Sequence, residues 1–162
     1  MKKKQSPSIK VLKEKTFLKM IENSIGANLW KNNYGEKNGK IIDLTQNGYL
    51  SCAFFVSSIL KIFDLVSEIH LTVEGLEKDL IKNHWQEISN FKKIEKGAVI
   101  IWEGTTEYNP FTKKEEFHSH SGFYLGNKKA VSMNSLNGFP AIHHYTYNET
   151  KKIKKIYCRP IK

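Results

Sequence analysis

An apolar segment at residues 52–64 constrains the fold more than any other part of the chain. Its nonpolar side chains would cover nearly every face of a helix: Ala53, Phe54, Phe55, Val56, Ile59, Leu60, Ile62 and Phe63. A helix of this kind is stable when most of its faces are buried. The sequence therefore predicts a central helix that begins at Cys52 and has other elements packed around it.

Two further helices are expected on either side of this segment. Apolar residues recur at helical spacing over residues 10–25, and Gly26 ends the pattern. Thr72 is a candidate N-cap for a later helix. The apolar stripe of that helix would be Val73, Leu76, Leu80 and Ile81.

After Lys96-Gly97 the pattern changes from helices to strands. Short strand-like runs occupy residues 98–102, 119–125, 130–134, 141–147 and 153–158. Residues 28–49 are expected as loop with a short extended piece, and residues 104–117 as a polar loop. Hairpin-length connections join antiparallel strands. The predicted fold class is therefore α+β, with N-terminal helices packed on an antiparallel sheet of about five strands.

Length and composition indicate one domain. The chain has 162 residues, of which 40% are hydrophobic, which is enough for a core. We expect a basic flexible tail at residues 1–9 and a single domain at residues 10–162. No apolar run reaches the roughly 18 residues of a membrane span. The basic start has no apolar h-region after it, so a signal peptide is not predicted, and location stays open between cytoplasm and export by another route.

The charge balance narrows the class of partners. The net charge is +10, which favours anionic partners such as cell-wall polymers, nucleic acid or acidic lipid. Nearly all basic residues are lysines, and Arg159 is the single arginine. Specific base readers rely on arginine, so no specific nucleic acid is expected. A monomer that needs no cofactor is the expected state.

Cys52 and His120 are the candidate reacting groups. Helix N-terminal amides stabilise a thiolate, and a neighbouring imidazole can act as its base. His120 opens the stretch His120-Ser121-Gly122-Phe123-Tyr124-Leu125-Gly126. Gly122 would leave room beside the imidazole. The plain alternative is a buried thiol and a satisfied strand histidine, and a buried free thiol is also expected for Cys158.

A third group is needed to orient the imidazole. If residues 127–129 form a three-residue turn, Gly126 faces Ala130, and even-numbered residues of both strands share one face. Ser132 and Asn134 would then point the same way as His120. A shorter turn would switch this parity.

These residues resemble the NlpC-type, papain-like cell-wall cysteine peptidases over residues 45–135. The His-x-Gly-x-Tyr-x-Gly stretch carries most of the resemblance. It implies a papain-like fold in which Cys52 attacks an amide of a cell-wall stem peptide and His120 is the base. The family motif Asp-Cys-Ser-Gly-Phe is replaced here by Ser51-Cys52-Ala53-Phe54-Phe55. The family's third residue, usually histidine, aligns with Ser132, and Asn134 is the substitute.

Further residues could complete such a site. The backbone N–H of Cys52 is the natural oxyanion donor. Tyr49 could add a hydroxyl there, and Trp30, Tyr34 and Trp102 could line a cleft, although core packing is favoured for Trp102.

Three other readings remain open. One is acyl transfer to or from another amide or ester by the same Cys52 and His120 pair. His118, His120 and His143 could bind zinc, with Glu115 and Glu116 nearby, although the spacing matches no strong zinc signature. Alternatively, the chain is a non-catalytic basic module that binds cell wall or nucleic acid on the same fold.

Overall fold

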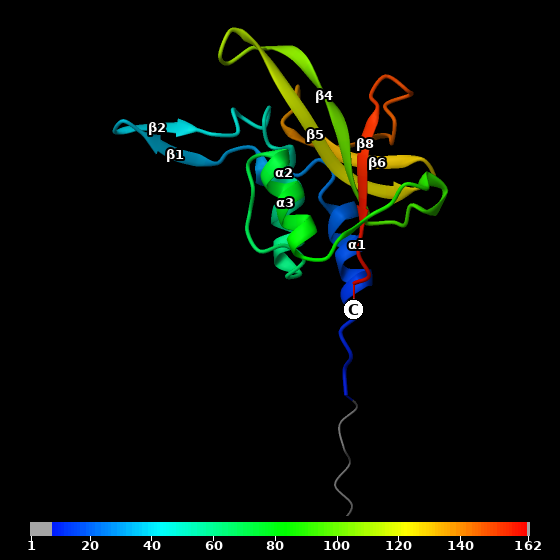
Figure 1. Cartoon of the computed structure of the whole chain (residues 1–162). Helices are drawn as coiled ribbons and strands as arrows, with labels where there is room; N and C mark the ends of the chain where they lie inside the picture. Colours follow the sequence, from blue (N-terminus) through cyan, green and yellow to red (C-terminus); the bar gives the residue numbers. More distant parts are fainter. Residues whose placement is uncertain (1–7, 162) are drawn as a thin grey trace, which may run out of the picture.

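A computed structural model describes residues 8–161 of the chain (Figure 1). Its first half holds three α-helices: α1 (Lys13–Asn23), α2 (Cys52–Ile62) and α3 (Val73–Lys82). Short 3₁₀ helices lie at η1 (Asn28–Trp30) and η2 (Phe91–Lys93), and a small hairpin is made by β1 (Tyr34–Lys37) and β2 (Lys40–Asp43). The remaining strands are β3 (Gln86–Glu87), β4 (Val99–Asn109), β5 (Lys114–Gly126), β6 (Lys129–Asn134), β7 (Phe139–His144) and β8 (Ile153–Cys158).

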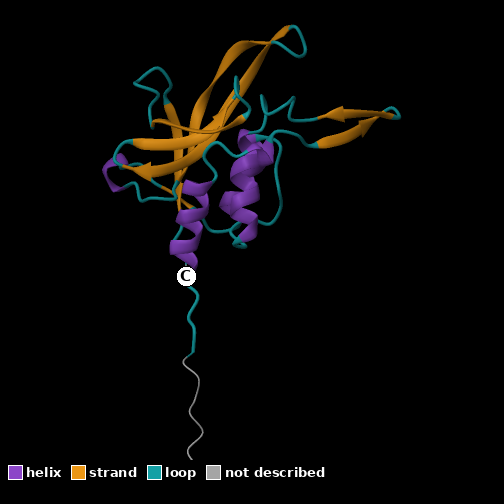
Figure 2. Cartoon of the chain, turned by 180° about the vertical axis from the view of Figure 1, so that it is seen from behind, coloured by secondary structure: helices purple, strands orange, loops and turns teal. Residues whose placement is uncertain are grey.

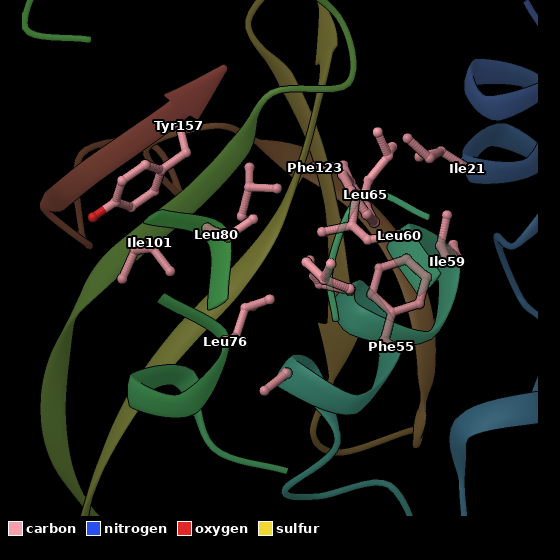
Figure 3. Close-up of a cluster of buried hydrophobic side chains, with 14 of the residues drawn as sticks. Ile21, Phe55, Ile59, Leu60, Leu65, Leu76, Leu80, Ile101, Phe123 and Tyr157 are labelled. Atoms are coloured by element: carbon pink, nitrogen blue, oxygen red, sulfur yellow. The ribbon is translucent and has the colours of Figure 1, made fainter. Parts of the chain in front are cut away.

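Helix α2 is the buried helix that the sequence predicts. Six of its eleven residues are buried. Phe55 packs edge-on against Phe123 of β5, with ring centroids 5.6 Å apart. The core around α2 also takes in Phe17 of α1. Ile21 of α1 and Leu76 and Leu80 of α3 belong to the same core (Figure 3). Helix α3 begins as expected, because Thr72 Oγ1 accepts a hydrogen bond from Gly75 N.

The β-strands form a six-stranded antiparallel sheet in the order β3-β8-β4-β5-β6-β7. The α+β class is therefore confirmed, with β3 as a short additional edge strand. One sheet face contributes Val99, Ile101, Phe123 and Val131 to the core shared with the helices. The other face carries a smaller cluster around Trp102, Ala98, Ile100, Ala130 and Ile156. Figure 2 shows the three α-helices gathered on one side of the sheet.

The predicted polar loop at residues 104–117 is wrong. Strands β4 and β5 continue their pairing after an irregularity between Trp102 and Thr105, from Thr105 opposite His118 to Asn109 opposite Lys114. This part of the hairpin projects from the body of the molecule (Figure 1). Because it is largely exposed, it has no apolar alternation to reveal it, although Thr105, Thr106 and Tyr108 favour extended backbone.

The turn between β5 and β6 also differs from the predicted one. Asn127 and Lys128 both have positive φ and form a two-residue turn, so that Gly126 pairs with Lys129. An irregularity between Tyr124 and Gly126 restores the parity that the shorter turn would have switched. Gly122 therefore lies opposite Ser132, and the predicted shared face is present for a different reason.

Two further expectations concern the N-terminal tail and the absence of a membrane-spanning helix. Most of the predicted flexible tail at residues 1–9 lies outside the described residues. Within residues 8–161, no helix has the length and apolar character needed to cross a bilayer.

Gly122 is where β5 and β6 approach most closely. A Cβ atom there would meet the carbonyl oxygen of Val131 and lie 2.8 Å from Ser132 Cβ. We expect Gly122→Ala to reduce the free energy of unfolding by about 1–3 kcal/mol, because backbone atoms cannot yield as a side chain can. Chemical denaturation would measure the loss.

Gly104→Ala is the matched control for this substitution. The new methyl group would meet the Phe117 ring, which is 66% exposed and can rotate away. A loss for Gly104→Ala as large as that for Gly122→Ala would contradict the close-approach explanation.

Candidate functional site

The segment before α2 is held by Asp43 at the end of β2. Its carboxylate accepts hydrogen bonds from the backbone amides of Asn33, Thr45 and Asn47 at 2.8–3.1 Å. Burial raises the pKa of Asp43, but these bonds outweigh burial and hold the pKa well below its usual range. Gly48, at φ +91°, then packs directly on the backbone of Gly138 in the β6–β7 turn. The chain is thereby fixed just before Cys52.

Cys52 is the first residue of α2, and the helix end beneath it is not capped by a side chain. Ser51 occupies the N-cap position, but its hydroxyl donates to Gly48 O at 2.9 Å instead of accepting from the helix. The amides of the first turn, which have no partner within a helix, are therefore not satisfied by Ser51. They can donate to an anion that forms at this end of α2.

The Cys52 thiol lies against the backbone of β5 at Ser119 and Ser121, the two residues that flank His120 in sequence. Its Sγ atom is 3.9 Å from the carbonyl oxygen of Ser119, and its side chain is partly exposed. Burial raises the pKa of the thiol, while the backbone amide and hydroxyl of Ser121 lower it in part. Ser121 is fully buried, and its hydroxyl has no hydrogen-bond partner within residues 8–161. That hydroxyl is available to a thiolate at Cys52.

His120 is held by Ser132 on the neighbouring strand. The distance from His120 Nε2 to Ser132 Oγ is 2.8 Å. The imidazole also lies beside the Trp102 ring, with centroids 5.5 Å apart. Burial, with smaller effects from the charges of Lys151 and His143, lowers the pKa of His120 to about 3. His120 is therefore neutral at neutral pH.

Two further residues meet at Ser132. Its Oγ is 2.8 Å from His143 Nε2 and 2.7 Å from the Tyr147 hydroxyl. The His143 and Tyr147 rings stack with centroids 3.8 Å apart. We call His120, Ser132, His143 and Tyr147 the Ser132 cluster. Burial lowers the pKa of His143 and raises that of Tyr147 to about 12, so the cluster carries no charge near neutral pH.

A cavity of about 510 Å³ opens between the N-terminus of α2 and the Ser132 cluster. Cys52, His120 and the rest of the Ser132 cluster all line it. Its other walls come from the start of α3 and the loop before it, from the β4–β5 hairpin, and from β6, β7 and the turn between them. They include Leu71, Val73, Phe117, Met133, Leu136 and Ile142. This volume is typical of sites for small ligands or short peptide segments.

Asn134 and Tyr49, two further predicted site residues, line the same cavity but make hydrogen bonds elsewhere. Asn134 lines the cavity, but its Oδ1 accepts from the amides of Leu136 and Asn137, and no bond joins it to His120 within residues 8–161. The Tyr49 hydroxyl donates to Tyr108 O at 3.3 Å, and Tyr49 lines the cavity.

The three other aromatic candidates do not line the cavity. Trp30 lies in the core against Phe55, with ring centroids 4.9 Å apart. Tyr34 is exposed on β1. Trp102 is fully buried, as favoured from the sequence, and packs beneath the Ser132 cluster.

His143 and Tyr147 are the site residues that sequence reasoning missed. His143 entered only as a possible zinc ligand, and nothing in the spacing of Tyr147 marks it. Among residues 8–161, no group of three or more histidine, cysteine, aspartate or glutamate side chains is placed to hold a metal ion. The donor set of the zinc alternative is thus not assembled in this part of the chain.

No protein-family model matches this sequence, and none of the curated proteins matches it either.

Ser121 provides a first test of the site. Removing its hydroxyl removes a buried donor beside Cys52, so Ser121→Ala should raise the thiol pKa further and slow alkylation near neutral pH. Iodoacetamide labelling across pH, read by peptide mass, separates Cys52 from Cys158. Ser135→Ala, an exposed serine on the cavity wall, is the control. Equal alkylation rates in both variants would exclude a role for the Ser121 hydroxyl.

The low pKa of His120 predicts a pH-dependent stability. The unfolded chain takes up a proton below about pH 6.5, whereas folded His120 stays neutral down to about pH 3. Stability should therefore fall as the pH drops through this window. Between pH 7 and pH 5, His120→Gln should lose about 1–2 kcal/mol less than the parent chain. Urea denaturation measures this, with exposed His84→Gln as control; identical pH slopes in all three proteins would show that His120 is not buried as described.

Proposed function

We propose that this chain is a papain-like cysteine hydrolase of the NlpC type, which cleaves amide bonds in cell-wall peptides. One observation carries the proposal. Cys52, at an uncapped helix N-terminus, opens onto the same cavity as His120, whose Nε2 is held by Ser132 at 2.8 Å. A nucleophile, a base and a group that orients the base are the parts that thiol catalysis needs.

The reaction would proceed through a thioester. His120 Nδ1, the nitrogen that Ser132 does not bind, takes the proton of Cys52 Sγ as the sulfur attacks the carbonyl carbon of the amide. The C–N bond then breaks, and the imidazolium returns the proton to the leaving amine. In the second half, His120 takes a proton from water as the hydroxyl oxygen attacks the thioester carbon. The C–S bond then breaks, the free acid leaves, and the imidazolium returns the proton to Cys52 Sγ.

The N-terminus of α2 supplies the stabilisation of the oxyanion. The backbone N–H of Cys52 and the neighbouring first-turn amides are free of the Ser51 side chain. They are fixed before substrate binds, so little reorganisation is needed when negative charge develops on the carbonyl oxygen.

The resting enzyme would hold a neutral thiol and a neutral imidazole. Burial shifts the pKa of Cys52 upward and that of His120 downward, and both shifts oppose a preformed ion pair. Proton transfer would then accompany attack on the substrate. In this mechanism His120 would act as general base from the first step.

The substrate class rests on the resemblance and on the charge of the chain. The net charge of +10 suits the anionic polymers of a cell wall. The cavity walls combine apolar side chains with Glu74, Glu107 and Lys151, which suits a peptide with both apolar and charged groups.

The two cysteines of the chain allow a matched test. Cys52→Ala should reduce the release of new amino groups from purified peptidoglycan by at least about 1,000-fold, because the nucleophile is lost. Cys158→Ala should keep the activity, since Cys158 does not line the cavity. Mass spectrometry of the released fragments identifies the bond.

Two results would count against the proposal. Hydrolysis that survives in Cys52→Ala would remove the thiol mechanism. Absence of hydrolysis in the parent chain, together with Cys52 alkylation no faster than that of a free thiol, would indicate a binding module instead.

A further inference from the structure

Ser132 has more hydrogen-bond partners than it has hydrogens. Its Oγ lies 2.7–2.8 Å from His120 Nε2, His143 Nε2 and the Tyr147 hydroxyl. We propose that His143 is a positioning residue that acts through Ser132 to fix the tautomer of His120. The inference rests on the proposed function, because it concerns the nitrogen with which His120 acts as base.

The proton on His143 can be placed from its partners. His143 Nδ1 lies 2.8 Å from the carbonyl oxygen of His144. A carbonyl oxygen only accepts, so Nδ1 must carry a hydrogen. Because burial keeps His143 neutral near neutral pH, its Nε2 has no hydrogen and must accept. Among residues 8–161, the group that bonds Nε2 and can donate to it is the Ser132 hydroxyl.

Ser132 then transmits this constraint to His120. A serine hydroxyl donates one hydrogen and accepts two. With its hydrogen committed to His143, Ser132 Oγ can only accept from His120 Nε2–H and from the Tyr147 O–H. His120 therefore carries its hydrogen on Nε2, and Nδ1 keeps the lone pair that accepts the proton of Cys52.

Without an acceptor at position 143, nothing holds the Ser132 hydroxyl hydrogen away from His120. The Ser132 hydroxyl could then rotate and donate to His120 Nε2, which would move the ring hydrogen to Nδ1. That tautomer cannot take a proton from the thiol through Nδ1. His143 thus does for Ser132 what a carboxylate or amide would do for His120 directly.

The test uses two substitutions at position 143. His143→Gln keeps an acceptor oxygen near the place of Nε2, whereas His143→Phe keeps the ring that stacks on Tyr147 and removes the acceptor. His144→Gln is the control, since His144 Nδ1 bonds Thr146 Oγ1 and not Ser132. ¹⁵N-histidine NMR at neutral pH reports which nitrogen of His120 carries the hydrogen.

The parent chain should show a protonated Nε2 and a bare Nδ1 at His120. His143→Phe should shift His120 toward the Nδ1–H tautomer and lower kcat by about tenfold or more at little change in KM. His143→Gln should retain the Nε2–H tautomer and most of the activity, and His144→Gln should match the parent.

Two outcomes overturn the inference. One is an NMR spectrum of the parent chain that shows the hydrogen on Nδ1 of His120. This measurement does not depend on whether any variant folds. The other is an unchanged tautomer and kcat in His143→Phe. The NMR readout does not require turnover, so a parent chain with the expected tautomer but no hydrolysis would count against the proposed function alone.

Discussion

The packing of α2 across β5 is the contact on which the rest of the structure depends. Helix α2 can be buried only if sheet and helices surround it, and Phe55 against Phe123 fixes where it crosses the strand. This crossing sets the first residue of the helix against Ser119 and Ser121 of β5. The position of the Cys52 thiol is therefore a result of core packing. The loop before Cys52 only fixes the path of the chain into α2.

Much of this framework could be predicted from local patterns. The buried helix, the Thr72 cap and the strands that form the sheet each depend on residues close in sequence, as does the choice of Cys52 and His120. Ser132 was predicted together with Asn134, and the structure puts Ser132 next to His120. The projecting part of the β4–β5 hairpin was missed because its solvated strands have no core face to leave an apolar alternation.

The Ser132 cluster could be predicted from the sequence only in part, because it depends on the register of three paired strands. His143 reaches Ser132 because β7 pairs with β6 such that Ala141 lies opposite Ser132 and His143 lies two residues further along. Tyr147 lies in the turn after β7, so no helix or strand pattern in the sequence indicates where its side chain points. Such contacts depend on exact turn lengths, and an error of one residue in a turn changes the face on which a side chain lies.

The two-residue turn and the irregularity before it also restrict how this hairpin could change in length. Each alone would put Ser132 on the helix side of the sheet, and together they cancel. A single inserted or deleted residue between Tyr124 and Ala130 would thus separate the histidine from its partner without disturbing the strands themselves. Insertion or deletion of two residues there would keep Ser132 on the same face as His120. The residues of this turn can therefore be substituted, but its length cannot change by a single residue without moving Ser132 to the other face of the sheet.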